Sequence, residues 1–325
     1  MSIRVGCAAW LFTEPAHNPP YEEAIAKIGK IGFDGVELIL RDFHDIGPDG
    51  YWTKEKIAEI KKMLDDLHLE VSQFAVFQNI TEGLASIVPA ERQKAIDYFR
   101  HGCDICAGLG GHIMNFVSPW PWEITSPNDY LPEYYYINVP GVDPRLRALN
   151  TFQTKMKYSF PKPFDWQKYW DNHVDAITRV ADIANEYGFI LAIENHANTM
   201  TPHTDSLLRL FDEVKRDNLG ANLDTVWAYL QREYLPWSVH KYGNKLFNVH
   251  MRDGDGLAAY NLPVGFGNID WEEFIRALYA INYDGFLSLE WSHDSRAEEN
   301  AANVLAYLRN LISEVGKEFC AEVSR

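Results

Sequence analysis

The stretch LAIEN, residues 191–195, is a run of apolar residues that ends in an ionisable side chain, Glu194. Three later stretches repeat this arrangement: ANLDT at 221–225, FNVHMRD at 247–253 and LSLEWS at 287–292. Short runs that are apolar along their length are typical of strands buried on both faces in a parallel sheet. The ends of four successive strands are therefore expected to carry Glu194, Asp224, His250 and Glu290.

Runs of this kind recur along the whole chain and alternate with helical patterns. Between the runs, apolar residues return at spacings of three and four, as at Ile57, Ile60 and Leu64, which indicates helices packed on one face. Eight such strand–helix units predict a parallel sheet covered by helices, which closes into a single (β/α)8 TIM barrel of the α/β class. The expected strands are 4–11, 35–40, 70–76, 112–117, 189–193, 220–223, 246–249 and 285–289.

Helix starts and domain organisation agree with this fold. Thr53, Asp205 and Asp270 stand where an N-cap oxygen would accept the first free backbone N–H groups of a helix. No linker rich in Pro, Ser or Gly interrupts the chain, so residues 1–325 are expected to form one domain.

One long segment, 118–165, departs from the pattern of short loops after the fourth strand. It is rich in Pro, Trp and Tyr, and a loop of this length inside a compact domain is usually functional. We interpret it as a lid whose Trp120 and Trp122 stack on a sugar, with an oligomer interface as the alternative, because both uses suit exposed aromatic rings.

The composition excludes several classes of partner. Thirty Lys+Arg stand against 46 Asp+Glu, a formal net charge of −16 that repels nucleic-acid phosphates and anionic membrane surfaces. No stretch is apolar over the length of a membrane-spanning helix or has the pattern of a secretory signal. The four cysteines are too few for a disulfide framework, so a cytoplasmic protein is expected. The CxxC at Cys103 and Cys106 lies in a helical pattern and is interpreted as core.

The four strand-end residues together predict a metal site. Any one of them alone would be better explained as a helix cap or as the partner of a lysine. Three carboxylates at adjacent strand ends, however, would repel one another strongly unless a cation held them. Carboxylate and imidazole ligands favour Mn²⁺, Mg²⁺, Co²⁺ or Zn²⁺ over a thiophilic metal, and Mn²⁺ is the metal expected here.

At these residues the chain resembles the xylose-isomerase-like TIM barrel superfamily, which includes sugar isomerases and epimerases, inosose dehydratases and barrel-type apurinic endonucleases. The resemblance covers nearly the whole chain. It implies that the four strand-end residues are metal ligands and that the two glutamates among them shuttle protons. It rests on IENH at 193–196, NLDT at 222–225, VHMRD at 249–253, PVGFGNIDW at 263–271 and YDGFLSLEW at 283–291.

Two departures from the superfamily pattern argue against a nuclease. Many relatives carry a histidine three residues after the aspartate of the sixth strand, where this chain has Trp227. The endonucleases also use additional histidines to assemble a three-metal cluster, and the sequence does not supply that complement around the four ligands. With the acidic net charge, this leaves an apurinic endonuclease as a remote alternative.

Further site candidates follow from their positions relative to the ligands. His196 lies two residues after a glutamate ligand, so strand alternation directs it at the same cavity, as a catalytic assistant or as a hydrogen-bond donor behind the ligands. Arg252, two residues after the histidine ligand, is expected to hold a substrate oxygen or to pair with Asp253. Glu37, interpreted as ending the second strand, binds sugar hydroxyls or satisfies the barrel interior. Trp227 is grouped with the substrate-binding residues.

The expected activity is that of a metal-dependent isomerase or epimerase of a non-phosphorylated sugar or keto-sugar. Removal of a proton next to a carbonyl is expected to form a metal-stabilised enediolate, with Glu194, Glu290 and His196 as catalytic residues. The alternative is a lyase that cleaves oxidised (3-keto) glycosides, such as the large subunit of a C-glycoside deglycosidase. The expected partners are a carbohydrate or glycoside and further copies of the chain, or a small β-rich subunit for the lyase. A barrel that only binds carbohydrate would need an incomplete ligand set, but all four ligands are present.

Overall fold

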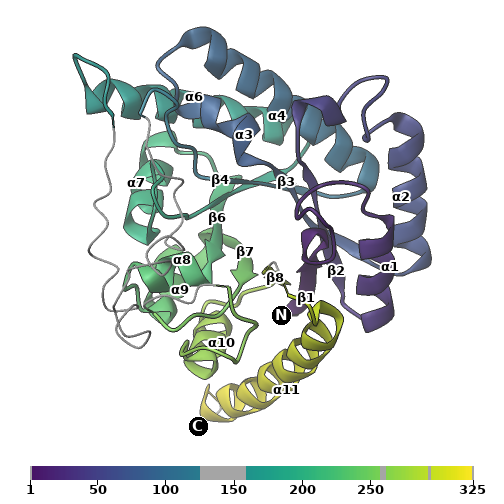
Figure 1. The fold of residues 1–325 in the computed structure, drawn as a ribbon. Coiled ribbons are helices and arrows are strands. Elements are labelled where there is room, and N and C mark those ends of the chain that lie inside the picture. The colour runs from purple at the N-terminus through teal and green to yellow at the C-terminus, as the bar shows by residue number, and fades with distance from the viewer. Residues whose placement is uncertain (1, 125–158, 257–260, 292–293, 324–325) are drawn as a thin grey trace, which may run out of the picture.

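The computed structural model describes residues 2–124, 159–256, 261–291 and 294–323. Eight parallel strands close into a barrel in chain order, each strand paired with the next and β8 paired with β1 (Figure 1). The predicted barrel is thus confirmed. The strands are β1 (Arg4–Ala8), β2 (Gly35–Leu40), β3 (Glu70–Val76), β4 (Ile113–Val117), β5 (Ile190–Glu194), β6 (Leu219–Asp224), β7 (Leu246–Met251) and β8 (Phe286–Leu289).

Helices surround the barrel and cover the outer face of its strands (Figure 1). Their buried apolar residues form one cluster with the strands, which is the core of the molecule. The α-helices of the described residues are α1 (Glu22–Ile31), α2 (Lys54–Asp66), α3 (Gln78–Thr81), α4 (Pro89–Leu109), α6 (Trp166–Glu186), α7 (Thr204–Val214), α8 (Thr225–Leu230), α9 (Leu235–Tyr242), α10 (Trp271–Ala280) and α11 (Ala297–Val323). The 3-10 helices are η1 (Ala9–Leu11), η2 (Phe43–Asp45), η3 (Glu82–Ala85) and η6 (Gly243–Lys245).

Two of the three predicted helix caps are confirmed. Thr53 accepts a hydrogen bond from the backbone of Lys56 at the start of α2, and Asp270 accepts one from Glu273 at the start of α10. The prediction for Asp205 is wrong, because the N-cap of α7 is His203, two residues earlier, and Asp205 lies inside the first turn of the helix.

The first strand is shorter than predicted. It ends at Ala8, and the next three residues form η1 while remaining buried. An apolar run cannot distinguish these two conformations, because both bury every residue. The helical turn matters for the site, since it places Trp10 at the mouth of the barrel.

The prediction for the cysteines can be checked in the structure, whereas the prediction for the insertion cannot. Cys103 and Cys106 are buried free thiols in α4, which confirms their interpretation as core. Most of the segment 118–165 lies outside the described residues, so its role as a lid or an interface stays a prediction. No helix in the described ranges combines the length and the apolar composition that crossing a lipid bilayer requires.

Candidate metal centre

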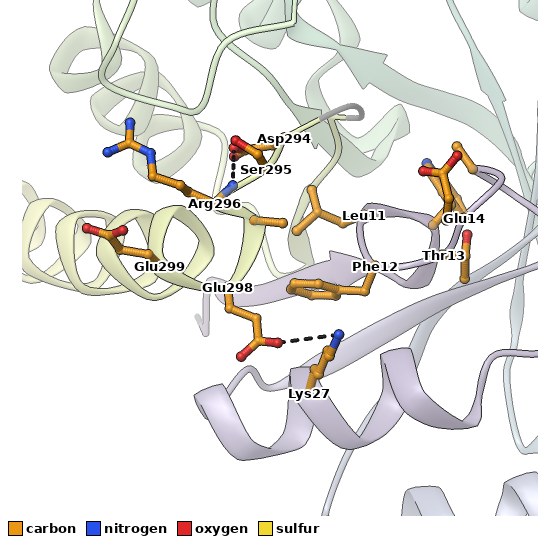
Figure 2. A pocket seen from close by; sticks show the side chains of 13 residues that line it. Leu11, Phe12, Thr13, Glu14, Lys27, Asp294, Ser295, Arg296, Glu298 and Glu299 are labelled. Atoms are coloured by element: carbon orange, nitrogen blue, oxygen red, sulfur yellow. Dashed lines mark hydrogen bonds and ion pairs between the residues drawn. The ribbon is translucent and has the colours of Figure 1, made fainter.

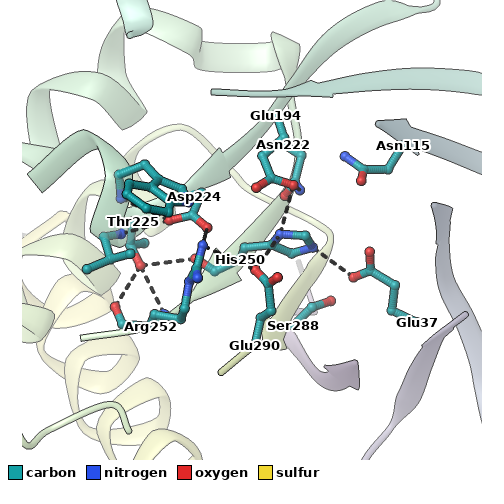
Figure 3. A network of polar contacts seen from close by, with 12 residues as sticks. Glu37, Asn115, Glu194, Asn222, Asp224, Thr225, His250, Arg252, Ser288 and Glu290 are labelled. Carbon is teal, nitrogen blue, oxygen red and sulfur yellow. Dashed lines mark hydrogen bonds and ion pairs between the residues drawn. The ribbon is translucent and has the colours of Figure 1, made fainter. Parts of the chain in front are cut away.

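The four strand-end residues converge at one point of the barrel mouth (Figure 3). Glu194 and Asp224 are the last residues of β5 and β6, His250 is the last but one of β7, and Glu290 directly follows β8. One possible ligand atom from each lies within 4.8 Å of the others. The first three are buried, and Glu290 is 14% exposed at its side chain. The predicted cluster is therefore present.

Asp224 has two separate tasks, one for each carboxylate oxygen. Its Oδ1 accepts hydrogen bonds of 3.0 Å from the backbone N–H groups of Val226 and Trp227, and so caps the N-terminus of α8. Its Oδ2 faces the cluster and contacts the guanidinium of Arg252. The aspartate is thus fixed by the helix that it begins, with one oxygen left for the site.

Side chains next to the ligands join the ends of the strands. The Asn195 amide accepts from the backbone N–H of Asp224 at 2.9 Å and donates to its carbonyl at 3.1 Å, which ties β5 to β6. The Thr225 hydroxyl bonds the carbonyl of His250 at 3.0 Å and accepts from the backbone N–H of Arg252 at 3.1 Å, which ties β6 to β7. Hydrogen bonds of this kind continue the strand ladders past their ends.

The ligand atoms lie close together in a way that suits a shared cation. His250 Nδ1 is 3.1 Å from Glu194 Oε2 and 3.0 Å from Glu290 Oε2. Among the described residues, however, neither Nδ1 nor Glu290 Oε2 has a partner with hydrogen-bond geometry, although both atoms are buried. Buried polar atoms normally have partners. Three carboxylates and one imidazole are ligands that Mn²⁺, Mg²⁺, Co²⁺ and Zn²⁺ accept, so these residues fit a divalent cation.

The electrostatics of the cluster lead to the same conclusion. Burial raises the pKa of Glu194 to about 7. Burial also acts to raise the pKa of Glu290, but Arg252 and His250 hold it well below its usual range. For His250, burial acts to lower the pKa, and the carboxylates around it, Glu37 foremost, hold it well above its usual value. The negative charge gathered here is offset only in part by one guanidinium and one imidazole.

Three predicted site residues gather on the β5–β7 side of the cluster. The rings of His196 and Trp227 lie 4.2 Å apart, and the Arg252 guanidinium lies 5.3 Å from the centre of the Trp227 ring. Burial lowers the pKa of His196 to about 4, so its imidazole is neutral. Arg252 pairs with Asp224, and its Nη2 is 3.6 Å from Glu290 Oε2. In the described part of the chain Arg252 is not paired with Asp253, whose carboxylate instead accepts from the indole of Trp271 and from nearby backbone.

The predicted position of Glu37 is wrong. It does not end the second strand but is the third residue of β2, fully buried, with its carboxylate inside the barrel. There Glu37 Oε2 lies 2.9 Å from His250 Nε2. The indoles of Trp120 and Trp122 bond the Ile124 carbonyl and the Glu82 carboxylate, so their predicted role in substrate binding stays a prediction.

Sequence reasoning missed several residues that support the ligands. The Trp10 indole N–H donates to Glu290 Oε1 at 3.3 Å, and the Asn222 amide donates to Glu194 Oε2 at 3.3 Å. One available signal was a polar residue directly after a ligand, as in the pairs Glu-Asn and Asp-Thr. Another was a polar residue inside an apolar strand, such as Asn222. Nothing local marks Trp10, whose partner is 280 residues away.

A pocket of about 630 Å³ lies next to the centre, between η1 and the start of α11 (Figure 2). Trp10 lines this pocket and also donates to Glu290, whereas Glu290 is not among the lining residues. Trp10 is therefore a residue that the pocket and the cluster share. Inside the pocket, Lys27 pairs with Glu298 at 3.3 Å.

Comparison with known proteins places the chain in a family. Residues 25–311 match the family described as "Xylose isomerase-like TIM barrel". An L-ribulose 3-epimerase from Methylomonas sp. is 31% identical over 89% of this chain and 84% of its own, and an inosose dehydratase from Bacillus velezensis is 21% identical over 83% of each. A solved L-ribulose 3-epimerase superposes with a TM-score of 0.72 at 17% identity, covering 99% of this chain and 98% of its own. The chain belongs to the xylose isomerase-like TIM barrel family.

Proposed function

We propose that this protein is a divalent-metal-dependent epimerase or isomerase of a non-phosphorylated ketose or keto-sugar. The observation that carries the proposal is the convergence of Glu194, Asp224, His250 and Glu290 within 4.8 Å of one another at the mouth of the barrel. The 31% identity to an L-ribulose 3-epimerase supports the same class of reaction. Mn²⁺ is the proposed metal.

The placement of the two glutamates suits proton transfer on two sides of a substrate. Glu194 and Glu290 come from β5 and β8, which are separated by β6 and β7 in the barrel, and both approach the same nitrogen of His250. A bound divalent cation supplies a Lewis acid that polarises the sugar carbonyl. One carboxylate then takes the proton from the neighbouring carbon and the other returns a proton from the opposite side, which inverts that carbon.

The surroundings hold these carboxylates in place and favour an uncharged sugar. Arg252 and Trp10 donate to Asp224 and Glu290, so each carboxylate keeps one oxygen in a fixed direction. The site gathers more carboxylates than cations, and the Arg252 guanidinium is already paired with Asp224. A phosphoryl group would meet net repulsion there, which is why we propose a non-phosphorylated substrate.

We also propose that the tilted ring pair of His196 and Trp227 forms one wall of the substrate site. A neutral imidazole can donate to or accept from a sugar hydroxyl, and an indole offers a flat apolar face to a sugar ring. His196 is then placed to assist the proton transfer at Glu194, two residues before it in the chain.

A second candidate is elimination from an oxidised sugar, which begins with the same removal of a proton. The match to an inosose dehydratase over 83% of the chain favours it. Loss of a β-substituent then replaces return of the proton, as in the lyase alternative. The two candidates differ in their products and share their first step.

Proton exchange tests the proposal directly. The Mn²⁺-loaded protein is incubated in D₂O with a panel of ketoses and 3-keto-glycosides, and deuterium at carbon is followed by NMR. Deuterium in a substrate that keeps its skeleton supports the epimerase or isomerase, whereas formation of a dehydrated product or release of an aglycone supports elimination. Absence of exchange across the panel, with Mn²⁺ bound, would contradict both.

A further inference from the structure

The interior of this barrel is polar around the metal centre, whereas TIM barrels commonly fill their interior with branched apolar side chains. Burying polar groups is costly unless they are hydrogen-bonded. Several of these residues lie around the ligands in Figure 3. The buried polar residues of the strands include Glu37, Gln73, Asn115, Asn222, Asn248 and Ser288.

Glu37 is the ionisable residue of this set, and its side chain extends across the barrel. It belongs to β2, which is not a neighbour of β7, yet its Oε2 lies 2.9 Å from His250 Nε2 (Figure 3). Gln73 donates to Glu37 Oε1 at 2.9 Å, and the same amide nitrogen is 2.8 Å from His250 Nε2. Both oxygens of the Glu37 carboxylate are therefore held by a partner, and the partner of Oε2 is the ligand His250.

The two nitrogens of His250 face different surroundings. Nδ1 faces the glutamates of the cluster, while Nε2 faces Glu37 and the Gln73 amide nitrogen on the opposite side of the ring. Of these two neighbours of Nε2, the carboxylate is the one that can accept a proton. An imidazole that binds a cation through Nδ1 carries its proton on Nε2, and metal-binding histidines generally donate that proton to a carboxylate, a carbonyl or water. Here a fully buried carboxylate stands at that place.

We propose that Glu37 is a positioning residue of the metal centre: by accepting the Nε2 proton of His250, it holds the ring with Nδ1 toward Glu194 and Glu290. This inference rests on the proposed metal site and goes beyond it. It also decides between the two roles expected for Glu37, because a fully buried carboxylate on the far side of the imidazole does not contact a sugar bound at the mouth.

The test compares Mn²⁺ affinity in the wild type and in Glu37→Gln. The substitution keeps the shape and an acceptor oxygen but removes the charge, so the variant is expected to fold and to bind Mn²⁺ roughly 10- to 100-fold more weakly. Free Mn²⁺ is measured by EPR during titration, without substrate. NMR of ¹⁵N-labelled histidine supplies a second readout, because replacing the charged acceptor by a neutral amide oxygen shifts the ring-proton signal of His250.

Ser72→Ala is the matched control. Ser72 is equally buried inside the barrel, and its hydroxyl lies 3.4 Å from that of Ser288 and contacts no ligand in the bonds described. This variant also removes a buried polar group, and wild-type affinity for Mn²⁺ is expected. Weakening of similar size in both variants would show a general effect of a disturbed interior and would overturn the assignment.

The remaining outcomes separate Glu37 from the proposed function. Wild-type affinity in Glu37→Gln, with or without a raised KM for the sugar, overturns the positioning role. If the wild type binds Mn²⁺ but exchanges no substrate proton, the proposed reaction fails while the two affinities still decide the role of Glu37. If the wild type binds no divalent cation, both proposals fail.

Discussion

The two oxygens of Asp224 allow its two tasks to be measured separately. In Asp224→Asn, the side chain keeps an oxygen that can accept from Val226 and Trp227, so α8 keeps its cap. The oxygen that faces the cluster is replaced by an amide nitrogen, which cannot bind a cation. In Asp224→Ala, both functions are lost. Both variants lose the charge that faces Arg252, and in the Asn variant an amide nitrogen, itself a donor, faces that guanidinium, so the comparison gives a lower limit for the contribution of the cap.

The difference in stability between the variants is therefore a lower limit for the contribution of the cap. Replacing an N-cap residue by Ala costs about 1 kcal/mol, and up to about 2 kcal/mol. Urea unfolding in EDTA should find the Ala variant less stable than the Asn variant by up to that amount. Both variants should bind Mn²⁺ more weakly than the wild type by more than about 100-fold, the upper figure for losing a residue behind the ligands.

Asp270 provides the matched pair of controls. It caps α10 through a single bond to Glu273 and is exposed. The Asn and Ala variants at this position should differ in stability in the same direction, and both should bind Mn²⁺ as the wild type does. The reasoning fails if the two Asp224 variants are equally stable, or if Asp224→Asn binds Mn²⁺ with wild-type affinity.

Two further predictions concern proton transfer and pH. Glu290→Gln keeps an oxygen near His250 Nδ1 but removes most basicity, so deuterium exchange should fall by about 10²- to 10⁴-fold, and a wild-type rate would remove Glu290 from the chemistry. His173 of α6 is fully buried with no hydrogen-bond partner among the described residues, and burial lowers its pKa to about 3. The unfolded chain takes up a proton on this ring below about pH 6.5 while the folded protein does not, so stability is lost as pH falls from there toward 3. Between pH 7 and pH 5, wild type should lose about 2 kcal/mol more than His173→Leu, and parallel urea-derived stability curves for the two proteins would contradict this.

The strands and the four ligands could be predicted because both depend on local pattern. An apolar run identifies a buried strand, and the carboxyl ends of parallel strands meet at one face, so Glu194, Asp224, His250 and Glu290 had to lie near one another. The caps of α2 and α10 were predictable for the same reason. Thr53 and Asp270 bond backbone only three residues ahead.

The failures concern contacts that no local pattern contains. Glu37 interrupts the run GVELIL, and it was interpreted as a strand-end residue although the run itself predicted a strand over 35–40. The Glu37 carboxylate can stand inside the barrel because it pairs with His250. That partner is 213 residues away in the sequence, so the pairing becomes visible only after the barrel closes. The contact of Trp10 with Glu290 has the same origin. Asp205 shows a smaller limit, since neighbouring polar residues compete for the cap and the observed N-cap, His203, lies two residues before the predicted one.

The side chains of Asn195 and Thr225 have a consequence for how this barrel can change. They join the ends of β5, β6 and β7 to one another after the regular ladder has ended, so three of the four ligands lie on strand ends that hydrogen bonds hold together. The loops that follow these strand ends can vary in length and composition, because the ligands are held by the strands and not by the loops. New substrate preferences can thus arise in the loops while the chemistry stays in place. Selection on substrate preference is then largely independent of selection on the chemistry of the ligands.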